Sequence, residues 1–262
     1  VQDAFFVDSG LTYDSPVTIT GFTNANPIVI TASSHGFENG DKVDITGIKV
    51  VDSTETRGWA YDTEIEGTGY TVANKTTHTF ELQNNSANVN GSSFKVYHSG
   101  GQVRKQVSEV SGLWHLEVES VVALANGYVV RDLTVASGKV TLPDASSRIH
   151  IGLPYTAEVE SLRLDNGNAA DTIQGRNKKI SKLTLRFERT LGGWVGPDRD
   201  HMREMKYGLV ALYGQPPDFI TDDKAITLSP SWNKDGQIVV QQRDPLPMTL
   251  LALVPDVVAG GN

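Results

Sequence analysis

The chain has 262 residues, no cysteine and a formal net charge of −8. This length allows one large core or two smaller ones, and the absence of cysteine excludes disulfides, thiolate metal sites and a cysteine nucleophile. The acidic balance argues against a dedicated nucleic-acid-binding protein, because it repels polyphosphate. The longest apolar run, Met248–Pro255, is too short to cross a bilayer, so no membrane insertion by this segment is expected.

The stretch from Phe22 to Val110 is rich in Asn, Thr, Ser and Gly and contains five short apolar runs typical of strands. The expected strands are Ile28–Thr31, Lys42–Thr46, Tyr70–Val72, Thr79–Leu82 and Ser93–Tyr97. Their inward-facing residues are expected to be Val43 and Ile45, Tyr70 and Val72, Phe80 and Leu82, and Phe94 and Val96. Five such strands can close a small β-barrel. We therefore predict an inserted small β-barrel domain over residues 22–110.

The inserted domain is expected to interrupt a β platform formed by residues 1–21 and 111–262. Domain insertion is best tolerated at exposed corners, and Thr20-Gly21 and Ser111-Gly112 are corners of that kind. Tight turns are predicted at Asn126-Gly127 and Ser137-Gly138, the second of them within a hairpin.

Alternating apolar residues dominate the platform. Leu183, Leu185 and Phe187 alternate with polar residues and predict one buried sheet face, and Ile238 and Val240 repeat the pattern less cleanly. No long stretch has helical spacing, although Asp198–Met205 allows a helical turn or two. The fold class is thus predicted as all-β, with a β-sandwich or barrel platform.

No constellation of catalytic residues stands out, so the chain is predicted not to be an enzyme and no catalytic residue, cofactor or metal site is assigned. The densest group of potential metal ligands is Asp198, Asp200, His201 and Glu204. A solvated acidic loop in which Arg199 and Arg203 pair locally is the favoured interpretation of this group.

Two carboxylates, Glu117 and Glu119, are expected on one strand face, where a solvated pair is more ordinary than a glycosidase pair.

Two further groups are candidates for contact with partners. Trp59 and Tyr61 lie in the long segment between Asp52 and Thr68, where they either stack on a glycan or a partner protein or belong to the core. Arg176, Lys178 and Lys179 form a short basic cluster that is a candidate for transient contact with DNA, although a solvated turn is the more ordinary interpretation.

The inserted segment resembles a small β-domain of phage tail proteins that is named after the FCCH domain of ubiquitin-activating enzyme. The residues that carry the resemblance are Ile28-Val29-Ile30-Thr31, His35-Gly36-Phe37, Asn39-Gly40-Asp41-Lys42-Val43, Gly69-Tyr70-Thr71-Val72-Ala73-Asn74 and Thr79-Phe80-Glu81-Leu82. This resemblance implies a fold and no ubiquitin chemistry.

The remainder resembles the tail-nozzle proteins of short-tailed phages, also called tail tubular protein B or stabilisation protein. The matching stretches are Asp3–Tyr13, Ser111–Glu117, His150–Tyr155, Lys178–Leu183, Arg243–Thr249 and Ala252–Pro255. In that family the motifs lie toward the C-terminal end of a longer polypeptide, and the first residue here is Val1 rather than methionine. We therefore expect the C-terminal part of such a protein, with the inserted domain as an accessory that many relatives lack.

The resemblance implies a structural virion protein that forms a homohexameric ring in the full-length protein. Such a ring seals the tail, meets the portal-adaptor ring and the tail fibres, and conducts DNA during ejection with only transient, non-specific contact. Its location would be the phage tail in the virion and the host cytoplasm during assembly. The alternative is a receptor- or carbohydrate-binding tail module carried by the inserted domain, and a third, weaker hypothesis is a tail-associated glycan hydrolase.

Overall fold

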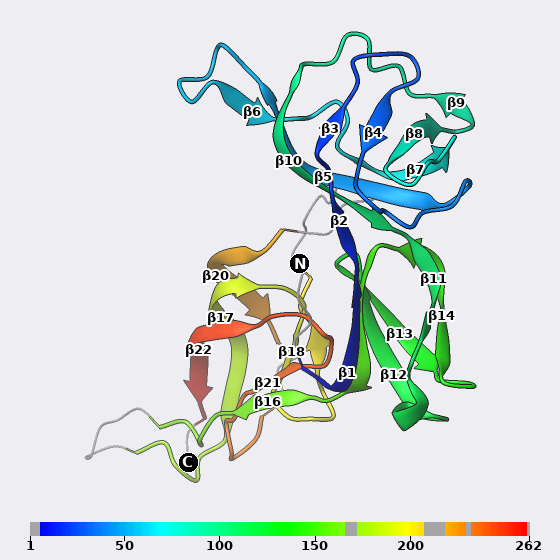
Figure 1. Cartoon of the computed structure of the whole chain (residues 1–262). Coiled ribbons are helices and arrows are strands. Elements are labelled where there is room, and N and C mark those ends of the chain that lie inside the picture. The colour runs from blue at the N-terminus through cyan, green and yellow to red at the C-terminus, as the bar shows by residue number, and fades with distance from the viewer. Residues whose placement is uncertain (1–5, 166–171, 207–217, 229–231, 261–262) are drawn as a thin grey trace. The chain divides into compact units, whose positions relative to one another are not determined.

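The computed structural model describes residues 6–165, 172–206, 218–228 and 232–260 (Figure 1). Within these residues the regular structure is β apart from one 3-10 turn, Trp114–Leu116, so the all-β prediction is confirmed. The described residues include no helix that is long and apolar enough to span a membrane.

Contacts divide the chain into two compact units, and each is described by itself. Unit 1 comprises Val1–Leu11, Val118–Thr134 and His150–Asn262, and unit 2 comprises Thr12–Glu117 and Val135–Ile149. Unit 2 thus extends beyond the expected insert, because residues on both sides of it pack with it. Whether residues 22–110 alone form a separable domain stays a prediction.

The main sheet of unit 2 has nine strands, in the order β2-β10-β5-β7-β8-β4-β3, with β6 paired to β5 and β9 paired to β8. The strands are β2 (Pro16–Thr18), β3 (Gly21–Phe22), β4 (Val29–Thr31), β5 (Lys42–Val51), β6 (Trp59–Tyr61), β7 (Gly67–Ala73), β8 (Thr79–Asn84), β9 (Ala87–Asn88) and β10 (Tyr97–Lys105). Four of the five expected strands overlap β4, β5, β7 and β8.

The sheet of unit 2 encloses one hydrophobic core. Most of the predicted inward residues belong to it: Val43, Ile45, Val72, Phe80 and Leu82 are buried, and Tyr70 packs against the same cluster. The fifth predicted strand is wrong, because β10 begins only at Tyr97. Phe94 still contacts the core, whereas Val96 is 61% exposed.

The expected closed barrel is not found in unit 2. β2 pairs with β10 at one end of the sheet, and β3 pairs with β4 at the other end. The two strands are successive pieces of one segment, joined by Ile19 and Thr20, whose amides donate to Gly101 O and Thr31 O, respectively. The two ends of the sheet, which we call the seam of unit 2, are therefore connected by the chain segment from β2 to β3 and not by strands that are hydrogen-bonded to each other.

A second sheet of unit 2 pairs β11 (Val107–Ser111) with β14 (Lys139–Ser146). The predicted turn at Ser137-Gly138 is confirmed, since both residues have positive φ and Ala136 exchanges two backbone hydrogen bonds with Lys139. The hairpin consists of this one residue pair, because the rest of β14 pairs with β11 and not with the residues before Ala136.

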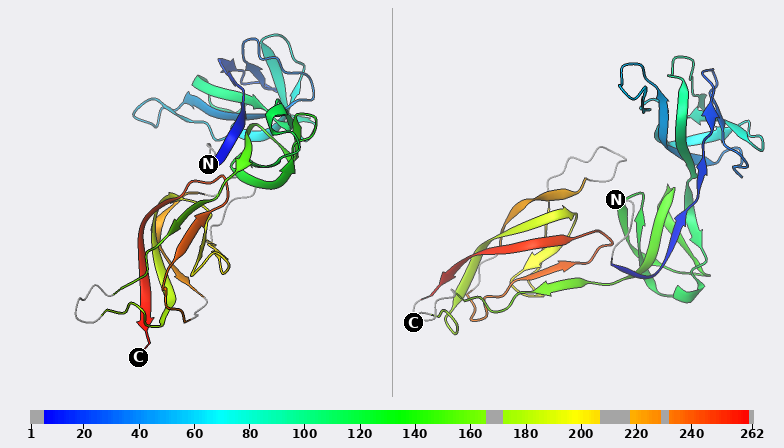
Figure 2. Two further views of the ribbon diagram at one scale, coloured as in Figure 1. Left: turned by 90° about the horizontal axis from the view of Figure 1, so that it is seen from below. Right: turned by 60° about the vertical axis from the view of Figure 1, so that its left-hand side comes forward.

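Unit 1 contains a two-layered sandwich and most of one four-stranded sheet, of which residues 12–14 and 148–149 belong to unit 2 (Figures 1 and 2). The four-stranded sheet has the order β1 (Val7–Asp14), β15 (Arg148–Pro154), β12 (Ser120–Ala125) and β13 (Tyr128–Thr134). The predicted turn at Asn126-Gly127 joins β12 to β13, with both residues at positive φ. Arg131 on β13 forms a two-pronged ion pair with the buried Asp244 carboxylate, with both N–O distances at 2.7 Å.

The sandwich is formed by a three-stranded sheet, β20-β17-β22, and a four-stranded sheet, β16-β21-β18-β19. The strands are β16 (Ala157–Glu160), β17 (Lys178–Thr190), β18 (Trp194–Gly196), β19 (Arg203–Glu204), β20 (Ile220–Thr227), β21 (Val239–Gln242) and β22 (Thr249–Ala259). Both sheets contribute to one core, which favours the sandwich over the barrel for the platform.

The predicted buried face of β17 is confirmed, since Leu183, Leu185 and Phe187 are at most 1% exposed. β21 departs from simple alternation, because Val239 and Gln241 are buried together with Val240. Val240 faces the core, whereas Gln241 faces away from it and is covered by the side chains of Glu158 and Arg243, to which it is hydrogen-bonded.

The helical turn allowed at Asp198–Met205 is wrong. The Asp198 carboxylate accepts hydrogen bonds from the amides of Asp200 and His201, which closes a tight side-chain turn. The chain then enters β19, where Arg203 pairs with Val195 on β18.

Candidate functional site

The two aromatic residues singled out in the sequence lie on a hairpin of unit 2 formed by β5 and β6, which projects from the sheet (Figure 1). Lys49 lies opposite Tyr61, and Val51 lies opposite Trp59. Side chains alternate along a strand, and Ile48 and Val50 face the core, so Lys49 and Val51 face outward together with the two aromatic rings.

Trp59 is surrounded by cationic and aromatic side chains. The Lys49 ammonium lies 4.1 Å from the centroid of the indole ring, and the Arg57 guanidinium lies 4.4 Å from it. The rings of Tyr61 and His98 are 5.7 Å and 6.3 Å away, respectively. Each cation–π contact contributes about 0.5–1 kcal/mol at an exposed site, so Trp59 favours the observed positions of both cations.

Tyr61 is the exposed ring of this face, with 56% of the residue accessible. Val51, which lies opposite Trp59, is 46% exposed, and Val96, whose carbonyl accepts from the Val51 amide, is 61% exposed. The two aromatic residues therefore do not tuck into the core, and Tyr61 presents an apolar ring with a polar hydroxyl to solvent.

Acidic residues hold the turn of the hairpin in place. Asp52 accepts hydrogen bonds from the Lys95 ammonium at 2.6 Å and from the amide and hydroxyl of Thr54. These bonds, that of Lys95 first, hold the pKa of Asp52 well below its usual value. Arg57 lies 3.9 Å from Glu55, and its Nε donates to Trp59 O. Lys49 has no ion-pair partner among the described residues.

The basic cluster predicted for contact with DNA does not form one surface. Lys178 is only 1% exposed, and its ammonium donates to Lys234 O at 2.9 Å. Lys179 is half-buried, and its ammonium lies 6.0 Å from the Trp232 ring centroid. The side chain of Lys178 is therefore unavailable to phosphate, because the alternation of β17 turns it inward.

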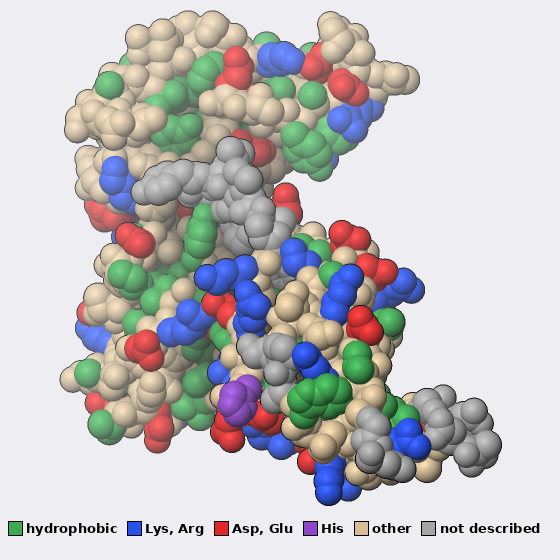
Figure 3. Space-filling model, turned by 180° about the vertical axis from the view of Figure 1, so that it is seen from behind, with side chains coloured by type: hydrophobic (Ala, Val, Ile, Leu, Met, Phe, Trp, Pro, Cys, Tyr) green, Lys and Arg blue, Asp and Glu red, His purple; other side chains and the backbone are tan. Residues whose placement is uncertain are grey.

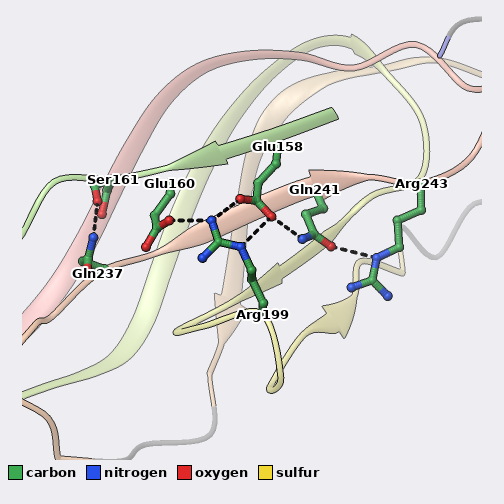
Figure 4. A network of polar contacts seen from close by, with 7 residues as sticks. All are labelled: Glu158, Glu160, Ser161, Arg199, Gln237, Gln241 and Arg243. Carbon is green, nitrogen blue, oxygen red and sulfur yellow. Dashed lines mark hydrogen bonds and ion pairs between the residues drawn. The ribbon is translucent and has the colours of Figure 1, made fainter. Parts of the chain in front are cut away.

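The acidic loop considered for a metal is used in a different way. Arg199 pairs across to β16, where it contacts both Glu158 and Glu160, rather than locally (Figure 4). Gln241 donates to Glu158 and accepts from Arg243, which extends the network along β21 (Figure 4). The hydrogen bond from Arg199 is the main cause that lowers the pKa of Glu158. This is a network of structural contacts on the outer side of the sandwich.

The remaining members of the acidic loop are separated from that network. Nδ1 of His201 lies 2.8 Å from Asp198, and Arg203 donates to Thr227 O. Burial raises the pKa of Asp198, but the hydrogen bonds from His201 and Asp200 outweigh it and the pKa is lowered. In the described part of the chain, no three His, Asp or Glu side chains are placed to hold a metal ion.

The expected pair of carboxylates on one strand face is also wrong. Glu117 lies in a turn, not in a strand, and its carboxylate accepts from the amides of Ser137 and Gly138 at 2.8 and 2.7 Å. It therefore caps the tight turn of unit 2, and Glu119 precedes β12.

No protein-family model matches this chain, and no curated protein is similar to it. The exposed β5–β6 hairpin is therefore assigned on its own geometry. Sequence reasoning found Trp59 and Tyr61 but missed Lys49 and Arg57. The signal that could have found them is the alternation of outward residues Lys49 and Val51 in β5, followed by a turn that ends at Gly58, because this pattern places β6 next to β5 in a hairpin.

Proposed function

We propose that this chain is a non-enzymatic structural subunit of a phage tail nozzle, whose copies close a ring that conducts DNA. The sequence resemblance supports the family. The structural observation that carries the proposal is the exposed apolar strand β22 at the edge of the sandwich in unit 1. An exposed apolar edge strand can pair with another chain, and monomeric proteins usually protect such edges.

β22 is eleven residues long and pairs, among the described strands, with β17 alone. Three of its apolar side chains, Leu251, Val254 and Val258, are 49–58% exposed. The opposite edge of the same sheet is β20, which carries Asp222, Asp223 and Lys224. Charges on an edge strand discourage pairing with other chains, and β22 carries one, Asp256, against three on β20, so β22 is the better contact surface of these two edges.

The charge distribution supports a conduit that does not hold its cargo. Lys, Arg, Asp and Glu side chains lie interspersed over unit 1 on the face drawn in Figure 3, without a broad surface of one sign. Tight binding of DNA requires many phosphates to be neutralised together, which interspersed charges of both signs do not provide.

The polar side chains support a structural role. Arg199, Glu158 and Gln241 hold neighbouring strands together, and Glu117 caps a turn. Arg186 and Asp223 join β17 to β20 in the same way, with N–O distances of 2.7 and 2.8 Å. Side chains used in this way stabilise a scaffold.

The test is the oligomeric state by native mass spectrometry and electron microscopy over a range of concentrations. Val254→Lys places a charge in the centre of the apolar strip and is expected to abolish association. Val118→Lys is the control, because Val118 is 80% exposed and lies outside the sandwich strands. A chain that is monomeric at every concentration, or a Val254→Lys variant that assembles like the wild type, would contradict the proposal.

A second candidate function rests on the exposed hairpin of unit 2. There Tyr61, Val51 and Val96 present apolar surface beside two cations. This arrangement favours a carbohydrate-binding module that accompanies the structural role.

A further inference from the structure

We infer that the outward face of the β5–β6 hairpin binds acidic oligosaccharides, with a sugar ring on Tyr61 and sugar carboxylates on Lys49 and Arg57. This inference rests on the second candidate function and names its ligand class. It is independent of the assembly surface on β22.

The aromatic part of the site is built to accept the apolar face of a sugar. Tyr61 is more than half exposed, and its ring is held edge-on to Trp59, with an interplanar angle of 90°. Because it lies on a strand rather than on a free loop, its backbone is fixed by pairing with Lys49. A rigid ring with a hydroxyl at its tip offers both stacking and a hydrogen bond.

The cationic part of the site selects the charge of the ligand. The ammonium of Lys49 lies 4.1 Å from the Trp59 ring and 5.7 Å from the Tyr61 ring. It is therefore held between the two aromatic side chains, and no carboxylate of the described residues forms an ion pair with it. Arg57 is positioned over the same indole and pairs with Glu55 only at 3.9 Å. A ligand carboxylate would supply the anion that Lys49 lacks.

The size of the face favours a short glycan over a protein partner. β6 has three residues, so the strip is about 10 Å long at the usual rise of a strand. A stable protein interface buries roughly 800 Å² on each side, which a three-residue strand does not offer. A short oligosaccharide needs only one or two aromatic rings and a few polar groups.

The charges around the hairpin disfavour a nucleic acid. Asp52, Glu55 and Glu64 lie in or directly beside the turn and β6. A strand of nucleic acid brings a charge with every phosphate and depends on a continuous positive groove. Asp52 and Glu55 are paired with Lys95 and Arg57, so among the described residues Lys49 is the cation without an ion pair in this group, which suits a ligand with separate carboxylates better.

The experiment measures binding of the whole chain by isothermal titration calorimetry. The acidic probes are trigalacturonate, a hyaluronan hexasaccharide and a trimer of α2,8-linked sialic acid. The neutral probe is trigalacturonate whose carboxylates have been reduced to alcohols, and oligo-dT tests for nucleic acid. We expect at least one acidic probe to bind about fivefold more tightly than the neutral probe, the size of one exposed ion pair.

Two variants separate the two parts of the site. Lys49→Gln is expected to reduce the preference for the acidic probe, since Arg57 remains, while leaving the neutral probe unchanged, and Tyr61→Ala is expected to weaken both. Lys75→Gln, which changes net charge equally at a lysine paired with Glu38, is the control and should bind like the wild type. Thermal unfolding shows that each variant is folded.

The outcomes distinguish the carbohydrate-binding function from the preference for acidic sugars. Equal binding of acidic and neutral sugars, weakened by Tyr61→Ala, would overturn the acidic preference and keep the carbohydrate-binding function. The absence of sugar binding, or binding of oligo-dT through the same residues, would overturn both. Acidic binding that is identical in Lys49→Gln and Lys75→Gln would overturn the site assigned here.

Discussion

Asp14 joins β1, β10 and β15 through Arg104 and Arg148, which like Asp14 belong to unit 2, and its replacement by asparagine tests how much that junction contributes to stability. One oxygen of the carboxylate accepts from Arg104 Nε on β10 at 2.7 Å, and the other accepts from Arg148 Nε on β15 at 3.0 Å. Asp14 itself ends β1. Asp14→Asn preserves the shape of the side chain and removes its charge.

The expected loss follows from the burial of the three side chains. A hydrogen bond to a charged group contributes about 1.5–3 kcal/mol, and breaking a buried ion pair leaves the partner charge uncompensated. The Asp14 side chain is 26% exposed, whereas that of Arg104 is 10% exposed. Solvent therefore screens part of the interaction, and asparagine still accepts one hydrogen bond. We expect a loss of about 2 kcal/mol in the free energy of unfolding.

The contribution of Asp14 to the free energy of unfolding also depends on pH. Burial raises the pKa of Asp14, but the hydrogen bonds and charges of Arg104 and Arg148 outweigh it, so the pKa in the folded state is lowered. A lowered pKa means that the folded state favours the ionised carboxylate. The stabilisation is complete above the unfolded-state pKa of about 3.9 and is lost as the pH falls through the folded-state pKa.

The assay is calorimetric unfolding of wild type and Asp14→Asn from pH 7 down to pH 2.5, compared at each pH. Glu38→Gln is the control, since Glu38 pairs with Lys75 at the surface with 68% of its side chain exposed. Its loss should stay below about 1 kcal/mol. Equal stability of Asp14→Asn and wild type at pH 7, or a difference that does not shrink below pH 3.9, would refute the reasoning.

Three further measurements test separate expectations. Phe187→Ala should cost unit 1 about 3–5 kcal/mol in calorimetry, because Phe187 is 1% exposed, whereas Val254→Ala on the exposed strand should cost under about 0.5 kcal/mol. Gly138→Ala should lower the free energy of unfolding by about 1–2 kcal/mol, because φ is +66° and the new Cβ would lie 2.5 Å from Trp114. Gly40→Ala, at φ +95° with no atom near the new Cβ, measures the cost of the backbone conformation alone. Fluorescence anisotropy with short duplexes at about 0.15 M salt should show only weak, sequence-independent binding, and tight selective binding would contradict the conduit.

Patterns of short range predicted much of the fold. Alternation identified the buried face of β17, and the Asn-Gly and Ser-Gly pairs identified two turns at positive φ. These features depend on one strand or one turn alone, so a single sequence contains the information.

Features that depend on distant residues were missed. The buried position of Lys178 is fixed by Asn233 and Lys234, more than fifty positions away. Arg199 reaches Glu158 and Glu160 across neighbouring strands, although local pairing was expected. The exposed aromatic residues were found, but the cations beside them require the register of β5 on β6.

The passage of β2 and β3 across the seam of unit 2 has a consequence for the order of folding. The segment must meet β10 on one side, where Val17 pairs with Val103, and β4 on the other, where Phe22 pairs with Ile30. The second contact spans a short loop and can form early. The first joins distant parts of the chain and carries the larger loop-closure entropy. Unit 2 should therefore complete its seam late and slowly, as proteins rich in non-local pairing do.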